Sequence, residues 1–100
     1  MSFGSHEMVV RVAIEGDFNR VGMQCWMLSR AENLGVHGWS RDRSSNETTE
    51  ALFAGEVALV LDMLRQFSDG DPPDGIKSVI ECEVTGDEPV WLGFHNLPGI

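Results

Sequence analysis

A glycine-bounded segment, Gly16 to Gly22 in the stretch GDFNRVGMQC, separates an alternating apolar run from residues with helical spacing. A turn between a strand and a helix start presents backbone N–H groups that lack partners within the helix. Such converging N–H groups bind anions, phosphate among them. The segment therefore predicts a candidate anion site, and it is equally typical of a plain strand-to-helix connection.

The two cysteines, Cys25 and Cys82, lie far apart and form no C-x-x-C pair. Such a pair is typical of zinc or redox sites, and larger sets of cysteines are typical of disulfide frameworks. We therefore expect both to be buried free thiols. Cys25 follows the candidate anion segment near a helix start, and we favour a core position for it over a nucleophilic role.

Other patterns for metal binding or catalysis are missing from the sequence. Three histidines lie beside no cysteine, which favours ordinary surface or packing positions over a metal centre: His6, His37 and His95. No G-x-S-x-G nucleophile elbow occurs. The acidic turn after residue 68 contains two prolines and lacks the ligand spacing of a calcium loop. We expect no bound metal.

The composition suits one compact domain, with 100 residues of which 42% are hydrophobic. No apolar run approaches the roughly 20 residues that a membrane helix needs. Seven Lys and Arg against sixteen Asp and Glu give a formal charge of −9, which argues against binding to nucleic acid or an anionic membrane. We expect a soluble, cytoplasmic monomer, with a disordered leader over 1–7 and a folded domain over 8–97.

The first half of the chain predicts a strand, a helix and a hairpin. Alternation over 8–14 places four residues on one face of a strand: Met8, Val10, Val12 and Ile14. Helical spacing over 22–34 predicts a helix that stops at Gly35, with a core face of Met23, Met27, Ala31 and Leu34, joined by Trp26 and Leu28. The segments VHGWS and TTEALFA predict a hairpin across the polar turn RDRSSNE.

The second half predicts a helix and one or two strands. EVALVLDMLRQF carries a helical apolar stripe before a stop at two prolines: Val57, Val60, Leu61, Leu64 and Phe67. IKSVIECEV predicts a strand with one wet side, whose other face holds Ile76, Ser78, Ile80, Cys82 and Val84. VWLGFH predicts a short last strand at an edge.

This order of elements predicts an α+β, ferredoxin-like βαββαβ sandwich, with an antiparallel sheet and two helices packed on one face. The layout hosts enzymes, metal carriers and RNA-binding domains, so it does not define a function. An RNA-recognition module needs basic and aromatic residues on its central strands, and the acidic balance of this chain argues against one.

Four segments, read in order, resemble the acylphosphatase family: GDFNRVGMQ, AENLGVHGWSRD, EALFAGE and DGDPPDG. The corresponding family patterns are G-x-V-Q-G-V-G-F-R, A-x-x-L-G-x-x-G-W-V-R-N and E-A-x-x-x-G, followed by a helix and a Gly- and Pro-rich turn. The resemblance runs from the first predicted strand to the fourth. It implies hydrolysis of acyl phosphates, which are carboxyl-phosphate anhydrides, without a metal or cofactor.

The resemblance also implies a site. In the family, loop N–H groups and a closing arginine hold the phosphate, and an asparagine orients the attacking water. Here Gln24 occupies the arginine position and Asp42 occupies the asparagine position. The expected ligand is a small acyl phosphate or another phosphate-like anion. The implied phosphate-binding loop consists of Gly16, Asp17, Phe18, Asn19, Arg20, Val21 and Gly22.

Both substitutions weaken the implied chemistry. A glutamine offers neutral donors in place of charge-assisted ones, and a carboxylate repels a phosphate. We therefore expect hydrolysis to be weak or lost. Arg20 stands where the family has glycine, so it would be strained if that position kept a positive φ.

Two interpretations of the charged residues remain open. In one, Arg20, Arg41 or Arg43 replaces the lost positive charge and Asp42 acts as a general base toward water. In the favoured one, Arg20 is solvated, Arg41 pairs across the sheet and Asp42 lies in a charged turn. The alternative function is a non-catalytic module that uses the loop or a sheet edge to hold a protein or small anionic ligand.

Overall fold

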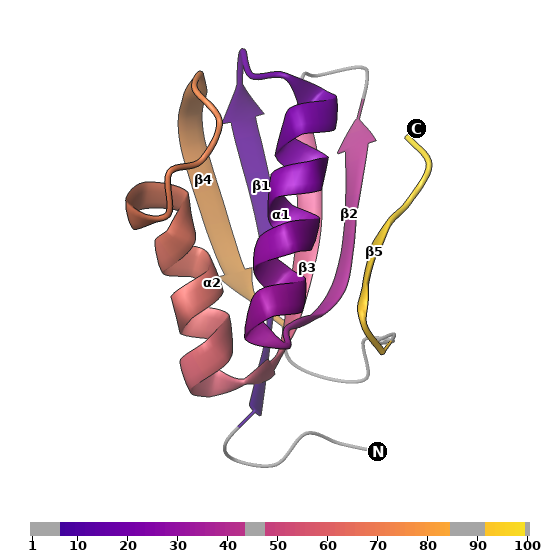
Figure 1. Cartoon of the computed structure of the whole chain (residues 1–100), viewed down its shortest axis with the longest axis vertical. Helices are drawn as coiled ribbons and strands as arrows, with labels where there is room; N and C mark the ends of the chain where they lie inside the picture. Colours follow the sequence, from indigo (N-terminus) through magenta and orange to yellow (C-terminus); the bar gives the residue numbers. More distant parts are fainter. Residues whose placement is uncertain (1–6, 44–47, 85–91, 100) are drawn as a thin grey trace.

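A computed structural model describes residues 7–43, 48–84 and 92–99 of the chain. Within them, two helices and five strands follow the order β1, α1, β2, β3, α2, β4, β5 (Figure 1). The strands are β1 (Glu7–Gly16), β2 (His37–Arg43), β3 (Thr48–Glu56), β4 (Ile76–Glu83) and β5 (Phe94–Asn96), and the helices are α1 (Arg20–Leu34) and α2 (Val57–Asp69). The predicted leader lies outside the described residues except for Glu7, which begins β1.

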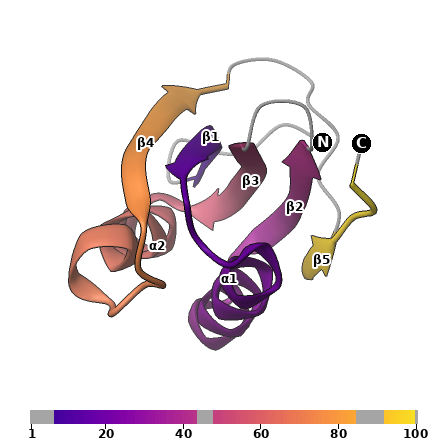
Figure 2. The ribbon, with the colours of Figure 1, turned by 90° about the horizontal axis from the view of Figure 1, so that it is seen from above.

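The strands form one sheet in the order β4-β1-β3-β2-β5. Both helices cover the same face of this sheet (Figure 2), so the predicted α+β, ferredoxin-like architecture is confirmed. The four strands of the predicted βαββαβ order pair antiparallel, as predicted, and the additional short strand β5 makes the sheet as a whole mixed. β5 pairs parallel to β2, while all other neighbours are antiparallel.

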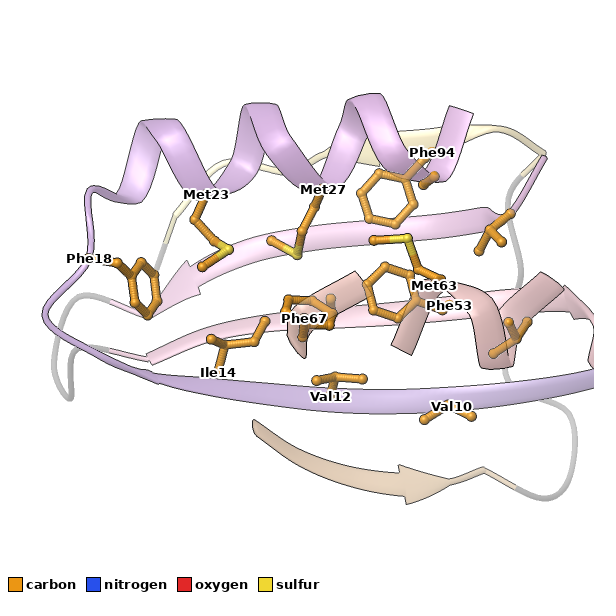
Figure 3. Packing of buried hydrophobic residues seen from close by; sticks show 14 residues of the cluster. Val10, Val12, Ile14, Phe18, Met23, Met27, Phe53, Met63, Phe67 and Phe94 are labelled. Atoms are coloured by element: carbon orange, nitrogen blue, oxygen red, sulfur yellow. The ribbon is translucent and has the colours of Figure 1, made fainter. Parts of the chain in front are cut away.

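The main core lies between the sheet and the helices. β1 contributes every second residue, as its alternation predicts, and α1 contributes Met23, Met27 and Ala31, all fully buried. Figure 3 shows Met23 and Met27 pointing from α1 into the same apolar layer as Ile14. α1 ends at Gly35, whose left-handed φ of 75° lets its N–H bond back to the helix, as predicted.

The apolar stripe of α2 is rotated from the prediction. Val60, Met63 and Phe67 are buried, whereas Leu61 is 44% exposed and does not belong to the core face. The sequence allows either assignment because Leu61 and Met63 both lie near the edge of a wide apolar face. Packing against β3 and β1 decides between them.

The two faces of β4 are also assigned differently. Val79 pairs with Ile14 and packs against the core, while Ile80 is 56% exposed on the other face. A register shift beside Gly16 places Ile76 on the same face as Val79, although the two are three positions apart, a spacing that puts side chains on opposite faces of a regular strand. The prediction that Ile76 and Ile80 share a face is therefore wrong.

The sheet face opposite the helices carries a second apolar cluster: Val9, Trp39, Leu52 and Ala54, with Val84 and Leu97 packed against it. The guanidinium groups of Arg11 and Arg41 lie 5.7 and 5.3 Å from the centre of the Trp39 ring. This distance suits a cation–π contact. In the described part of the chain, neither helix is long and apolar enough to cross a membrane.

Candidate functional site

The candidate anion loop joins the end of β1 to α1. Gly16 ends β1 with a φ of 152°, and the backbone of Gly75 passes so close that a Cβ at Gly16 would collide with its carbonyl oxygen. The N–H of Asp17 donates to that same carbonyl oxygen at 2.9 Å. The loop is therefore held against the turn that precedes β4.

α1 begins at Arg20, two residues before the helix start expected at Gly22, because Asn19 caps it. The Asn19 side-chain oxygen accepts the N–H of Gly22 at 2.7 Å. The Asn19 carbonyl oxygen accepts the N–H of Met23 at 2.9 Å. An asparagine in extended backbone conformation is among the best residues for this role. Arg20, Val21 and Gly22 are thus the first turn of a helix and not part of a loop.

Two consequences for anion binding follow from this cap. Arg20 has helical backbone and is not among the positive-φ residues, so the strain that a positive φ would impose there does not arise. The amides of Asp17 and Gly22 are already bonded within the protein. A phosphate at this loop would have to displace the Asn19 side chain to bond the Gly22 amide. The loop therefore offers fewer N–H donors than the N-terminus of an uncapped helix.

Arg20 and Asp42 lie on either side of Thr49. Thr49 is fully buried on β3, and its hydroxyl donates to Asp42 Oδ1 at 2.7 Å. Thr49 Oγ1 also accepts a hydrogen bond from Arg20 Nη1 at 3.2 Å. The Arg20 guanidinium also lies 5.2 Å from the centre of the Phe18 ring. Arg20 is therefore anchored and half-buried, and its interpretation as a solvated residue is wrong.

Sequence reasoning missed Thr49 because a single threonine carries no motif. The signal was the hairpin register, in which Thr49 pairs directly with Asp42. Alternation along TTEALFA places Thr49 on the same face as Phe53, toward the core. A correct register would therefore have put a hydroxyl beside the candidate catalytic carboxylate.

Arg41 and Arg43 belong to the opposite face of the sheet from Asp42, since side chains alternate along β2. Arg43 forms an ion pair with Glu50 at 2.6 Å. Arg41 is the register partner of Glu50, yet its guanidinium lies over Trp39. Its Nε is buried without a hydrogen-bond partner among the described residues. Neither arginine is placed to replace a positive charge at the loop.

Gln24 lies in the second turn of α1, beside the buried Met23, and is half-buried. Within the described ranges, no hydrogen bond links its side chain to the loop or to Asp42. Of the two implied catalytic positions, the structure therefore ties only Asp42 into a polar network. Phe18 is buried in the core, and Val21 is 72% exposed.

Cys25 and Cys82 are both free and both exposed, so the prediction of buried thiols is wrong. Cys25 follows Gln24 on the outer side of α1, while Cys82 shares the exposed face of β4 with Ile80. His37 and His95 fix the chain around β5, since His37 Nδ1 accepts the N–H of Gly93 and His95 Nε2 bonds to the Leu92 carbonyl oxygen. His6 and the hairpin turn over 44–47 lie outside the described residues.

The C-terminal segment lies along β2 beside Asp42. Ser40 Oγ donates to Asn96 Oδ1 at 2.7 Å, and the N–H of Leu97 donates to the Ser40 carbonyl oxygen at 2.8 Å. Further along, a Cβ added at Gly99 would lie 3.4 Å from the Asp42 carbonyl oxygen, so the segment stays close to β2 at this point. This segment therefore borders one side of the candidate site.

Comparisons with known proteins agree with one another. Residues 10–95 match the family model described as Acylphosphatase. An acylphosphatase of Nitrobacter hamburgensis is 38% identical and aligns with 94% of this chain and 98% of its own length. One from Acidiphilium cryptum is 35% identical over 81% of this chain and 86% of its own. The structure of an acylphosphatase from Coxiella burnetii superposes with a TM-score of 0.77 at 19% identity, covering 92% of this chain and 94% of that one.

Proposed function

Because this chain belongs to the acylphosphatase family, we propose that it is an acylphosphatase-like protein whose hydrolysis of acyl phosphates to carboxylate and phosphate is weak or lost. The observation that carries the proposal is a double substitution: a neutral Gln24 stands at the position that the family uses for arginine, and a carboxylate, Asp42, stands at the position that it uses for asparagine.

The first support is the loss of positive charge at position 24. An arginine holds phosphate through a planar fork of charge-assisted hydrogen bonds, which are about twice as strong as the neutral ones that Gln24 can donate. Removing one preorganised donor from an oxyanion site lowers kcat by about 10²-fold to 10³-fold. A loss of at least this size is expected here, because charge is removed together with geometry.

The second support is the carboxylate itself. Asp42 accepts a hydrogen bond from the hydroxyl of the buried Thr49, which favours its present orientation. A carboxylate about 4 Å from a phosphate oxygen repels it by up to about 4 kcal/mol at an effective dielectric constant near 20. Substrate binding is therefore weakened as well as turnover.

The roles in any remaining hydrolysis follow from these positions. The segment from Gly16 to Gly22 holds the phosphate, with the reduced set of amides that the Asn19 cap leaves. Gln24 contacts the phosphate. Asp42, which carries one hydrogen bond on Oδ1, orients the attacking water or accepts its proton.

Benzoyl phosphate turnover tests the proposal directly. The unmodified protein should hydrolyse it slowly above the buffer rate, and Gln24→Arg with Asp42→Asn should raise the rate by at least about 10²-fold. Arg65→Gln, on the exposed side of α2, is the control for a change of charge alone, and it should leave the rate unchanged. Rapid, saturable hydrolysis by the unmodified protein would contradict the proposal. No gain from the double variant would show that the loop geometry, and not the two side chains, limits the reaction.

A non-catalytic binding module is the second candidate function. The Asn19 cap favours it, because an amide that is already bonded is not offered to a phosphate. Such a module would hold a protein or small anionic ligand at the loop or at a sheet edge. A phosphate titration that shifts none of the amides from Gly16 to Gln24 would support this candidate over the hydrolase.

The proposed ligand is a small acyl phosphate or another phosphate-like anion, handled by a cytoplasmic monomer. The formal charge of −9 supports this choice over nucleic acid or an anionic membrane surface as the partner.

A further inference from the structure

We infer that the Thr49 hydroxyl holds Arg20 and Asp42 apart and so keeps the Arg20 guanidinium available to a phosphate-like anion. The inference rests on the proposed function, because it places the anion at the loop before α1. It makes Thr49 a positioning residue, and it assigns to Arg20 the charge that Gln24 does not provide.

The geometry of the hydroxyl carries the inference. Thr49 Oγ1 donates to Asp42 Oδ1 at 2.7 Å and accepts from Arg20 Nη1 at 3.2 Å. A hydroxyl has one donor and two acceptor positions, so it satisfies both partners at once. The three residues come from β3, β2 and the first turn of α1, and Thr49 itself is fully buried. The link is therefore part of the packed structure and not a surface contact.

Arg20 and Asp42 do not form an ion pair with each other in the described structure, although both bond to the same atom. Arg20 gives one hydrogen bond to Thr49 and rests on the Phe18 ring. Its remaining N–H donors have no partner among the described residues. A guanidinium held in this way can offer two parallel donors to a phosphate.

Removing the Thr49 hydroxyl would let Asp42 compete with phosphate for the Arg20 guanidinium. A valine at position 49 would keep the side-chain shape but would leave Asp42 without its donor. The opposite charges of Asp42 and Arg20 would then pair directly, and a phosphate would have to displace the carboxylate. Since partly exposed ion pairs are modest, we expect phosphate affinity to fall by roughly 3-fold to 10-fold.

The test is a titration of inorganic phosphate followed by NMR at the backbone amides and at the Arg20 side-chain Nε–H. In the unmodified protein, Arg20 should shift with phosphate. Thr49→Ser keeps a hydroxyl and should bind within about 2-fold of the unmodified protein, while Thr49→Val should bind more weakly, as estimated above. Where Thr49→Val does not fold, Thr49→Ala replaces it and is judged by the same outcomes.

A double-mutant cycle separates this role from a structural one. In an Asp42→Asn background there is no carboxylate to capture Arg20, so Thr49→Val should change phosphate affinity by less than about 2-fold. A purely structural threonine would weaken binding equally in both backgrounds, and that result would overturn the inference. Arg20→Gln should abolish most of the binding, whereas Arg65→Gln should not.

The turnover assay tests the proposed hydrolysis and the phosphate titration tests the role of Thr49, so a negative result in one does not decide the other. Absence of benzoyl phosphate hydrolysis would reject residual catalysis and would leave the phosphate measurements to decide the role of Thr49. Absence of any phosphate-dependent shift at Arg20 in the unmodified protein would overturn the inference, whatever the turnover.

Discussion

The side-chain oxygen of Asn19 accepts the backbone N–H of Gly22 at 2.7 Å, inside the segment that we propose to hold phosphate. The cap that stabilises the start of α1 therefore occupies an N–H group that an anion would otherwise bind. At this one contact, helix stability and anion binding compete for the same donor.

Replacing Asn19 should separate these two effects. Asn19→Ala should lower the free energy of unfolding by about 1 kcal/mol, because the helix loses its cap, and Asn19→Ser should retain most of it. The Gly22 amide should shift with phosphate in Asn19→Ala but not in the unmodified protein. Urea unfolding and amide NMR measure the two quantities. Equal phosphate-induced shifts at Gly22 in both proteins would contradict the proposed competition.

Gly16 and Gly55 form a matched pair for testing the contact between the loop and the turn before β4. Their φ angles are similar, 152° and 147°, but only Gly16 lies against backbone, at Gly75. Gly55→Ala should therefore cost about 1 kcal/mol through backbone strain alone. Gly16→Ala should cost a further ~1–3 kcal/mol from overpacking. Equal losses in denaturant unfolding would show that the contact at Gly75 yields easily.

The C-terminus of α2 is capped by side chains from α1. Arg30 Nη2 and Trp26 Nε1 donate to the Gly70 carbonyl oxygen at 2.9 and 3.3 Å. Arg30→Met should reduce the free energy of unfolding by about 1 kcal/mol, because it removes a charged donor from a helix end. Arg65→Met, which breaks an exposed pair with Asp62, should cost less than about 0.5 kcal/mol and serves as the control. Thermal unfolding of both variants provides the comparison.

Ser40 holds β5 to the sheet through its bond to Asn96, and its own side chain is fully buried. Ser40→Ala should cost about 1 kcal/mol and should speed hydrogen exchange at the Leu97 amide, which bonds to the Ser40 carbonyl oxygen. Exchange at the Leu52 amide, in the middle of the sheet, should change only as much as global stability does. Unchanged exchange at Leu97 would mean that backbone pairing with β2 and the packing of Phe94 hold β5 without the Ser40 hydroxyl.

The residues that a periodic pattern controls were predictable, and those that depend on register were not. The core faces of β1 and α1 follow from alternation and from the spacing of Met23, Met27 and Ala31. The faces of β4 do not, because a shift beside Gly16 breaks the alternation that the sequence suggests. Leu61 and the two cysteines were misplaced because apolar character alone does not say which side chain faces the core.

The candidate site shows the same division. Family motifs pointed to Gly16–Gly22, Gln24 and Asp42, and these remain the predicted site residues. The link through Thr49 depends on which residues of β2 and β3 stand opposite each other, and the composition of the chain does not predict this register. The early start of α1 depends on a single cap at Asn19, which a helical pattern beginning at Gly22 does not reveal.

The position of β1 between β3 and β4 has a consequence for how the protein is made. Both neighbours of this strand come later in the chain, beginning at Thr48 and Ile76, so a nascent chain that ends before Thr48 has no strand on which to complete its sheet. Closing such distant contacts is slow compared with forming a helix. Folding must therefore wait until most of the chain has left the ribosome, and a nascent segment ending before Thr48 has to remain unaggregated until then.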